Sequence, residues 1–247
     1  MGAFLMRMLV TRPEPDAQAT RERLMALDIE AVAAPVMTRQ TLAARLPPPD
    51  GFAALAVTST NALRALADLG ALAALRPLPL FAVGDRTAHE ARLLGFASVT
   101  AAEGTLQSLV ARIALAQLDG PVLYPAGRHQ SGDMAHALAP HGLMTVMVEI
   151  YEMVAETALP AAAMAQLQAG TLGAVLLYSR RTAEIFCTLA AGLPPQRRRA
   201  LAMLCLSENV AAPPLAHRFS RVLLADHPSE EAMLALALAF AREQTAS

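Results

Sequence analysis

Hydrophobic and polar positions follow a regular order along this chain: a short apolar run, a turn, and then a longer amphipathic segment. The apolar runs are nearly continuous, which is typical of strands that are buried on both faces of a sheet. The segments after them have the spacing of helices with one apolar face. This alternation predicts an α/β fold with parallel sheets and helices on both faces.

The predicted elements cover most of the chain. Strands are predicted at residues 8–11, 31–34, 53–57, 80–83, 98–100, 122–124, 145–149, 174–177, 202–206 and 222–224. Helices are predicted at residues 15–26, 60–69, 86–94, 106–117, 133–140, 160–169, 182–190, 209–216 and 229–242. Roughly ten strands are too many for one compact open sheet at this length, so two sheets of about five strands are expected.

A weak internal repeat suggests how the two sheets share the chain. The stretch AVTSTNALRAL, which contains Ser59, resembles VLLYSRRTAEIF, which contains Ser179. Similarly, the segment around Val10 resembles the segment around Leu123. If the two halves fold alike, the first strand and helix must complete the sheet of the C-terminal half.

This argument predicts two similar domains, of which the first is discontinuous in sequence. Domain one comprises residues 1–36 and 150–247, and domain two comprises residues 40–147. The chain crosses between them at residues 35–40 and 149–154. Both crossings are extended in character, so we expect them to pair as a two-stranded β linker.

The composition allows a large core and excludes several classes of protein. Hydrophobic residues make up 55% and charged residues 17% of the 247 residues, so the chain is not disordered. The formal net charge is −1, without a basic block, which argues against nucleic-acid binding. No stretch of about 20 apolar residues is free of charge and proline, so no membrane-spanning helix is expected.

Two residue types narrow the chemistry further. The chain contains no lysine, which excludes a Schiff-base lysine and a P-loop lysine. Cys187 and Cys205 are too few for a disulfide framework and are predicted to be buried free thiols. Free thiols predict a cytoplasmic protein.

Polar residues follow the predicted strands, where open α/β sheets bind their ligands. They are rich in Ser, Thr, Gly and Arg, which offer hydroxyl groups, backbone N–H groups and cations to an anion. This pattern predicts a site for a polyanionic small molecule, although the same residue types also suit the starts of helices. The candidate binding residues are Arg12, Thr58, Ser59, Thr60, Gly84, Thr87, Gly104, Gly127, Ser179, Arg180 and Ser207.

Familiar catalytic motifs are missing from the sequence. It contains no G-x-x-x-x-G-K-[ST], no H-E-x-x-H and no G-x-S-x-G, and no G-x-G-x-x-G follows a strand. His129, His136 and His141 lack the spacing of metal ligands and are predicted to be solvated, so no metal site is expected. Residues 197–199, all arginine, follow two prolines and are predicted to form an exposed loop.

Tyr151 differs from these residues because it lies in the second predicted crossing, in the sequence EIYEMV. A tyrosine between two domains could donate a proton or a hydrogen bond to a ligand. It could equally pack the linker. Its position alone leaves both roles open.

Taken together, the motifs resemble the uroporphyrinogen-III synthase family. The resemblance rests on LVTRPEPDA, LAVTSTNALRAL, LFAVGDRTAHEARLLGF, VLYPAGRHQSGDMAHAL, VEIYEMV, AVLLYSRRTAEIF and LCLSENVA, in that order. The resemblance implies two similar α/β domains joined by a two-stranded ladder. It also implies a cyclising lyase of haem biosynthesis that converts hydroxymethylbilane into uroporphyrinogen III, with loss of water and inversion of the last pyrrole ring, and without a cofactor.

The resemblance also assigns roles to residues. It makes Tyr151 the candidate that assists loss of the hydroxyl group, and it makes Thr58, Ser59 and Thr60 a hydroxyl cluster near the substrate. It places Gly84, Thr87 and Ser179 in further binding turns. The turn at residues 207–209 reads Ser-Glu-Asn where the family commonly has I-G-P-T-T, which weakens a role for hydroxyl groups there.

The substrate's eight carboxylates would be held by backbone N–H groups and some arginines. Available cations are Arg12, Arg86, Arg128, Arg180 and Arg181. We expect a cytoplasmic monomer that receives its substrate from the preceding enzyme and binds neither nucleic acid nor membranes. The alternatives are a non-catalytic two-domain protein that binds a small anion and a flavodoxin-like cofactor binder.

Overall fold

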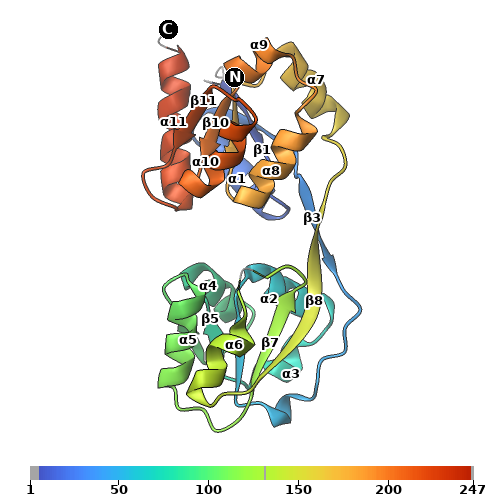
Figure 1. Ribbon diagram of the computed structural model, residues 1–247, viewed down its shortest axis with the longest axis vertical. Coiled ribbons are helices and arrows are strands. Elements are labelled where there is room, and N and C mark those ends of the chain that lie inside the picture. Colours follow the sequence, from blue (N-terminus) through green and yellow to red (C-terminus); the bar gives the residue numbers. More distant parts are fainter. Residues whose placement is uncertain (1–5, 131, 246–247) are drawn as a thin grey trace. The chain divides into compact units, whose positions relative to one another are not determined.

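The computed structural model describes residues 6–130 and 132–245 (Figure 1). The chain divides into two compact units, each with a sheet at its centre and helices on both faces. Unit 1 comprises Met1–Thr38 and Val154–Ser247, and unit 2 comprises Arg39–Met153. The α/β fold class predicted from the sequence is therefore confirmed.

The sheet of unit 1 is parallel and has the strand order β11-β10-β9-β1-β2. Its strands are β1 (Met6–Val10), β2 (Ile29–Ala33), β9 (Ala174–Leu177), β10 (Ala202–Cys205) and β11 (Arg221–Leu224). Its helices are α1 (Asp16–Met25), α7 (Ala161–Ala169), α8 (Arg180–Leu189), α9 (Pro195–Ala200), α10 (Glu208–Ala216) and α11 (Glu230–Thr245). The N-terminal strand β1 lies between β2 and β9, so the two ends of the chain build one sheet.

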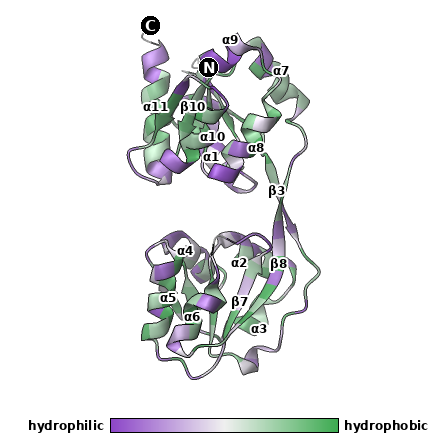
Figure 2. Ribbon diagram, viewed as in Figure 1, coloured by the Kyte–Doolittle hydropathy of each residue, from purple (hydrophilic) through white to green (hydrophobic). Residues whose placement is uncertain are grey.

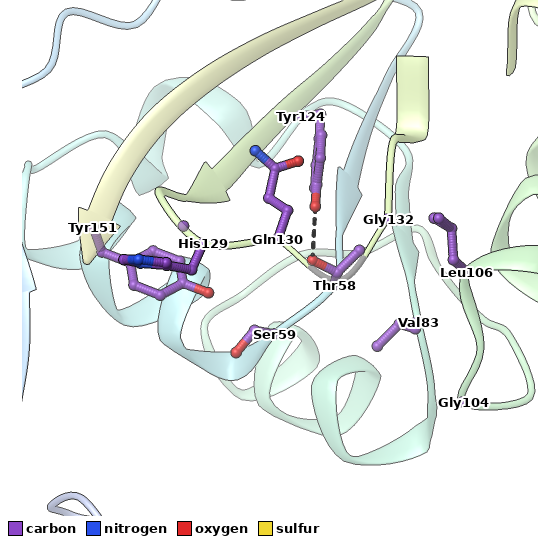
Figure 3. A pocket seen from close by; sticks show the side chains of 11 residues that line it. Thr58, Ser59, Val83, Gly104, Leu106, Tyr124, His129, Gln130, Gly132 and Tyr151 are labelled. Atoms are coloured by element: carbon purple, nitrogen blue, oxygen red, sulfur yellow. Dashed lines mark hydrogen bonds between the residues drawn. The ribbon is translucent and has the colours of Figure 1, made fainter. Parts of the chain in front are cut away.

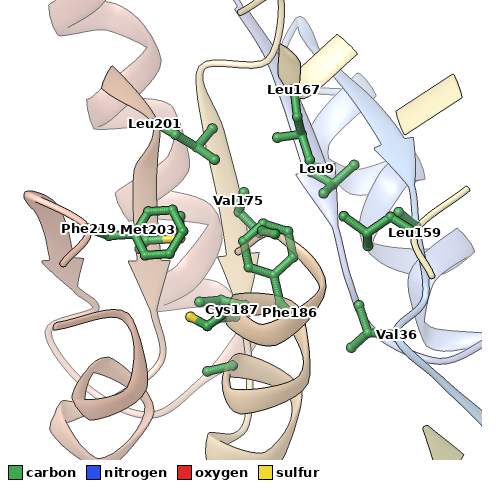
Figure 4. Packing of buried hydrophobic residues seen from close by; sticks show 14 of the residues in the cluster. Leu9, Val36, Leu159, Leu167, Val175, Phe186, Cys187, Leu201, Met203 and Phe219 are labelled. Atoms are coloured by element: carbon green, nitrogen blue, oxygen red, sulfur yellow. The ribbon is translucent and has the colours of Figure 1, made fainter. Parts of the chain in front are cut away.

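The two faces of this sheet carry separate cores, because neighbouring residues of a strand point to opposite sides. On one face, Leu9 and Val175 pack with Phe186 of α8 (Figure 4). On the other face, Met8 packs with Phe240 of α11. The strands are coloured as hydrophobic in Figure 2, as expected for strands covered on both faces.

The sheet of unit 2 has the strand order β3-β8-β7-β4-β5-β6. Its strands are β3 (Met37–Thr41), β4 (Ala54–Val57), β5 (Leu80–Ala82), β6 (Val99–Ala101), β7 (Val122–Gly127) and β8 (Thr145–Ala155). Its helices are α2 (Thr60–Asp68), α3 (Leu72–Leu75), α4 (Asp85–Leu93), α5 (Leu106–Leu115) and α6 (Met134–Leu138), with short 3₁₀ turns at Pro49–Gly51 and Ala139–His141. Strands β4 to β8 run parallel to one another.

The neighbouring strands β3 and β8 contain both crossings between the units. The N–H of Leu42 donates to the carbonyl of Ile150 at 2.9 Å, and the N–H of Glu156 donates to that of Val36 at 2.9 Å. Residue numbers rise along β3 while those of the paired residues in β8 fall, so these two strands run antiparallel.

One local prediction is wrong. The three arginines at residues 197–199 were predicted to lie in a loop, but they lie in α9, which starts at Pro195. Proline suits the first turn of a helix because its missing N–H would have no partner there. The Nε of Arg197 donates to the carbonyl of Gln168 at 2.8 Å, which ties this short helix to α7.

Candidate functional site

Unit 2 contains a cavity of about 300 Å³ beyond the carboxyl ends of its strands (Figure 3). This is the place where open α/β sheets bind ligands. The described residues that line it are Thr58, Ser59, Val83, Gly104, Leu106, Tyr124, Gly127, His129, Gln130, Gly132 and Tyr151. No Arg, Asp or Glu is among these residues. The wall therefore offers hydroxyl, amide, imidazole and backbone groups rather than a fixed charge.

Tyr151 reaches the cavity because β8 contains a bulge. In the pairing of β7 with β8, Ala126 lies opposite Glu149 and Gly127 lies opposite Tyr151, so Ile150 is an extra residue. Ile150 and Tyr151 are consequently both buried, at 0% and 8% exposure, although neighbours in a regular strand point to opposite faces. The bulge allows Ile150 to join the core while Tyr151 forms part of the cavity wall.

Gly127 provides the space that the Tyr151 ring occupies. A Cβ atom at residue 127 would lie only 2.7 Å from Cζ and 3.0 Å from the hydroxyl oxygen of Tyr151. The N–H of Arg128 also donates to the Tyr151 carbonyl at 2.9 Å, which fixes the backbone beside the ring. Any larger residue at position 127 would have to displace the phenol.

Burial raises the pKa of Tyr151 above its ordinary value, while a hydrogen bond with Ser59 lowers it to a smaller extent. Tyr124 raises and Arg39 lowers the same pKa through their charges, with smaller effects than burial. The phenol is therefore protonated at neutral pH and can donate a hydrogen bond or a proton.

A second phenol lies in the same wall. The hydroxyl of Tyr124 lies 3.1 Å from Oγ1 of Thr58, within hydrogen-bond distance (Figure 3). Tyr124 is 4% exposed, and its burial raises the pKa of this phenol as well. The wall therefore contains two neutral phenols, of which that of Tyr124 lies within hydrogen-bond distance of a hydroxyl group in the turn between β4 and α2.

The other predicted residues of unit 2 lie close to this wall. Thr60 is the first residue of α2, and Thr87 lies in the first turn of α4; both are buried. Gly84 precedes α4, and a Cβ there would lie 3.4 Å from Cα of Gly104. Gly104 has a φ of +86°, a conformation that favours glycine. Of the predicted set, Thr58, Ser59, Gly104, Gly127 and Tyr151 line the cavity itself.

Arg12, in unit 1, is buried within an ion-pair network. It is 8% exposed and forms an ion pair with Glu230 at the start of α11. It also donates to Oγ1 of Thr20 at 3.1 Å and to Asp16 at 3.3 Å. Its guanidinium lies 4.2 Å from the centre of the Tyr178 ring. These contacts join the N-terminal segment to the last helix.

The remaining predicted residues lie at the starts of helices in unit 1. Ser179 caps α8: the N–H of Thr182 donates to its Oγ at 3.1 Å. Arg180 is exposed and pairs with Glu184 at 2.8 Å. Ser207 precedes α10 without a side-chain hydrogen bond to that helix. Of these three residues, Ser179 is therefore the one whose side chain caps a helix.

Sequence reasoning missed several residues of the cavity. Tyr124 was treated only as a strand residue, and His129 only as a solvated one, yet both line the cavity. Val83, Leu106, Gln130 and Gly132 also line it. The sequence did contain one indication for Tyr124. It lies near the carboxyl end of a predicted buried strand, where open α/β sheets bind their ligands.

The family profile of uroporphyrinogen-III synthase HemD matches residues 18–235. The chain belongs to the uroporphyrinogen-III synthase family. This family comprises cyclising lyases of tetrapyrrole and haem biosynthesis, and it implies hydroxymethylbilane as the substrate. The resemblance seen in the sequence is therefore confirmed, and the alternative of a non-catalytic anion-binding protein is not supported.

Solved structures share the fold of this synthase-family chain. One is the uroporphyrinogen-III synthetase of Helicobacter pylori 26695, with 20% identity, a TM-score of 0.67, and 95% of this chain and 100% of that chain covered. A mutant uroporphyrinogen III synthase of the extremely thermophilic bacterium Thermus thermophilus matches with 15% identity and a TM-score of 0.54, covering 97% and 99%. No curated protein sequence matches the chain. Among the described residues, no helix is long and apolar enough to cross a membrane.

Proposed function

We propose that this uroporphyrinogen-III synthase closes hydroxymethylbilane in the cavity of unit 2, with Tyr151 as its catalytic residue. The observation that carries the proposal is the neutral phenol of Tyr151, held at the cavity wall by the β8 bulge and by Gly127. Loss of a hydroxyl group needs a proton donor, and a phenol with a raised pKa stays protonated at neutral pH.

The Tyr151 phenol alone can supply and take back the proton that the proposed reaction needs. The C–O bond of the hydroxymethyl group breaks, and the oxygen leaves as water with a proton that the Tyr151 phenol donates. The positively charged carbon that remains is attacked by the carbon of the last pyrrole that carries the bridge to the third ring. That bridge bond then breaks and forms again at the free α-carbon of the same pyrrole, which inverts the ring. The proton released when the pyrrole regains its aromatic form can return to the tyrosine oxygen. No net proton or electron is consumed.

The cavity favours binding of part of the substrate. Its volume of about 300 Å³ is at the lower end of the ~300–1,000 Å³ usual for small-molecule sites. It therefore suits the reacting end of a linear molecule with four pyrrole rings. The enzyme's main task is then to hold a flexible chain so that the correct carbon attacks, which is catalysis by proximity and orientation.

The substrate contacts that we propose extend beyond Tyr151. In unit 2 they are Thr58, Ser59, Gly104 and Gly127 at the wall, supported by Thr60, Gly84 and Thr87. In unit 1 they are the exposed Arg180 and the helix-start residues Ser179 and Ser207. The buried pairing of Arg12 with Glu230 favours a structural role for this arginine instead.

We further propose that the protein acts as a monomer in the cytoplasm. The buried free thiols of Cys187 and Cys205 suit a reducing compartment. Because hydroxymethylbilane also closes without an enzyme, a short-lived transfer from the preceding enzyme would limit that loss.

The test is product analysis after adding the protein to freshly prepared hydroxymethylbilane. Without enzyme the symmetric type I isomer forms, and with the native protein we expect the type III isomer to predominate. Heat-unfolded protein serves as the control and should leave type I predominant. An isomer ratio that the native protein does not change would overturn the proposal. Binding without a change in that ratio would instead indicate an anion-binding protein.

A further inference from the structure

The cavity wall contains a second pair of hydroxyl groups, those of Tyr124 and Thr58, and the proposed function leaves the role of Tyr124 unassigned. Tyr124 comes from β7 and Thr58 from the turn after β4, two strands that are neighbours in the sheet. Both residues line the cavity, and their oxygen atoms are 3.1 Å apart. In Figure 3 the Tyr124 side chain points down to Thr58, on a different part of the wall from Tyr151.

This pair can present a hydrogen to a ligand. Each hydroxyl group has one hydrogen, and a hydrogen bond between the two groups uses only one of them. The geometry allows either hydroxyl to donate, but a phenol is a better donor than an aliphatic alcohol. This difference favours donation from Tyr124 to Thr58, which leaves the Thr58 hydrogen available. Donation by the phenol also polarises the Thr58 hydroxyl and strengthens its own hydrogen bond. Burial keeps the Tyr124 phenol protonated at neutral pH.

The surroundings indicate what this hydrogen would meet. Thr58 lies two residues before the start of α2, whose N-terminus favours negative charge. No Arg is among the described residues that line the cavity, so a carboxylate there would depend on hydroxyl, amide, imidazole and backbone donors. Hydroxymethylbilane carries such carboxylates on every ring.

We propose that Tyr124 is a positioning residue, which orients the Thr58 hydroxyl so that it donates to a carboxylate of the bound substrate. The inference rests on the proposed function, since it assumes that the tetrapyrrole occupies this cavity. A carboxylate exists before and after the reaction, so the contact stabilises the substrate and the transition state alike. Its loss should therefore raise KM and leave kcat nearly unchanged.

The experiment compares Tyr124→Phe, Thr58→Val and the double variant in the assay of the type III product. Each single change should raise KM about 3- to 10-fold, because one hydrogen bond is lost in each. The double variant should show about the same KM as Thr58→Val, because Tyr124 acts through Thr58. Thr58→Ser keeps the hydroxyl group and should restore a KM close to that of the native protein.

The controls separate this inference from a general loss of structure. Thr188→Val makes the same chemical change on α8, where the Thr188 hydroxyl donates to the carbonyl of Glu184 at 2.9 Å, and it should leave KM unchanged. Phenylalanine fills the space of the tyrosine ring, so the circular dichroism of Tyr124→Phe should match the native protein. Its free energy of unfolding in urea should fall by no more than about 1 kcal/mol, the value of the lost hydrogen bond to Thr58.

Several outcomes would overturn the inference. They are an unchanged KM in Tyr124→Phe, a loss confined to kcat, and effects of the two single variants that multiply in the double variant. If Tyr124→Phe does not fold, Thr58→Val and Thr58→Ser still decide whether the hydroxyl at residue 58 sets KM. The proposed function fails separately, when the native protein itself forms no type III product.

Discussion

The carboxyl ends of the strands differ in the two units, although both units have a largely parallel sheet with helices on both faces. In unit 1, the end of β1 leads into Arg12, whose guanidinium is buried against Glu230 and Tyr178. In unit 2, the end of β4 leads into Thr58, whose hydroxyl lies at an open cavity. At the end of β1 the charged side chains pair with one another, whereas the end of β4 keeps room for a ligand.

This difference shows that topology gives the place for a site but does not decide whether one forms. The Arg12 network satisfies its own charges, because a buried cation needs partners to offset the loss of water. A neutral hydroxyl group beside a cavity, as in unit 2, can stay partly unpaired at a smaller cost in free energy than a buried charge can. Changes in the first region should therefore affect stability, and changes in the second should affect activity.

The largest effect is expected from Arg12→Met. This change leaves Glu230 as a poorly solvated carboxylate without its main partner, so the free energy of unfolding should fall by about 2–3 kcal/mol. Urea unfolding measures this loss. The double variant Arg12→Met with Glu230→Gln should lose less, because it leaves no unpaired charge. A loss below about 0.5 kcal/mol for Arg12→Met would show that water already solvates the pair.

Tyr151→Phe should show the opposite behaviour. Removing the phenol hydroxyl should lower kcat about 100-fold, because a general acid contributes at least that much, while the free energy of unfolding in urea should fall by no more than about 1 kcal/mol. The matched change in unit 1, Tyr178→Phe, removes a hydrogen bond of 3.3 Å to Glu230 and should cost about 1 kcal/mol of stability with little effect on kcat. Native kcat in Tyr151→Phe would leave this residue with a packing role only.

Gly127→Ala tests whether the position of the phenol matters as well as its presence. The added methyl group would meet the Tyr151 ring at 2.7 Å and displace it, so kcat should fall at least about tenfold. In a Tyr151→Phe background the same change should lower kcat little further, since no hydroxyl is left to misplace. Equal losses in both backgrounds would mean that residue 127 acts independently of Tyr151.

The last effect appears only in alkali: a loss of stability, which should be larger in unit 1. Burial raises the pKa of Cys187 and of Cys205 to about 12, and burial also raises the pKa of Tyr178. The unfolded chain loses its thiol protons near pH 9, while the folded chain keeps them. Above pH 9 the unfolded state therefore binds fewer protons, and the free energy of unfolding falls as pH rises.

The loss should be on the order of 1 kcal/mol per thiol for each pH unit above 9, up to about pH 12. Urea unfolding between pH 7 and 10.5 measures it. The variant with Cys187→Ala and Cys205→Val should start from a lower stability but show a shallower fall with pH. Equal slopes in the variant and the native protein would contradict a contribution from the thiols.

Much of the fold could be predicted from the hydrophobic pattern. The strand Ala174–Leu177 was predicted residue for residue, because a run buried on both faces is apolar throughout, and here it follows a glycine and precedes Tyr178 and Ser179. The strand β7 was predicted to end at Tyr124, before Pro125, but it continues to Gly127. That difference mattered, because the extra residues bring Gly127 opposite Tyr151.

The site could be predicted only in part. Thr58, Ser59 and Tyr151 were identified because helix starts and strand ends leave a visible pattern of hydroxyl residues. The bulge at Ile150 leaves no such pattern, since an apolar residue beside a tyrosine fits a regular strand equally well. Tyr124 and His129 were missed for a related reason: whether a side chain faces a cavity or a core depends on what packs opposite it.

The sequence by itself determined the order of the strands and of most helices, their apolar faces, the family and the hydroxyl groups at the strand ends. These properties depend on neighbouring residues and on periodicity, which a single chain displays directly. Only the tertiary structure decided that Arg12 forms a buried ion pair with Glu230 and that the Tyr151 ring packs against Gly127. It also decided that Tyr124 lines the same cavity as Tyr151. Those contacts join residues far apart in sequence, and they depend on register and packing, which local pattern does not contain.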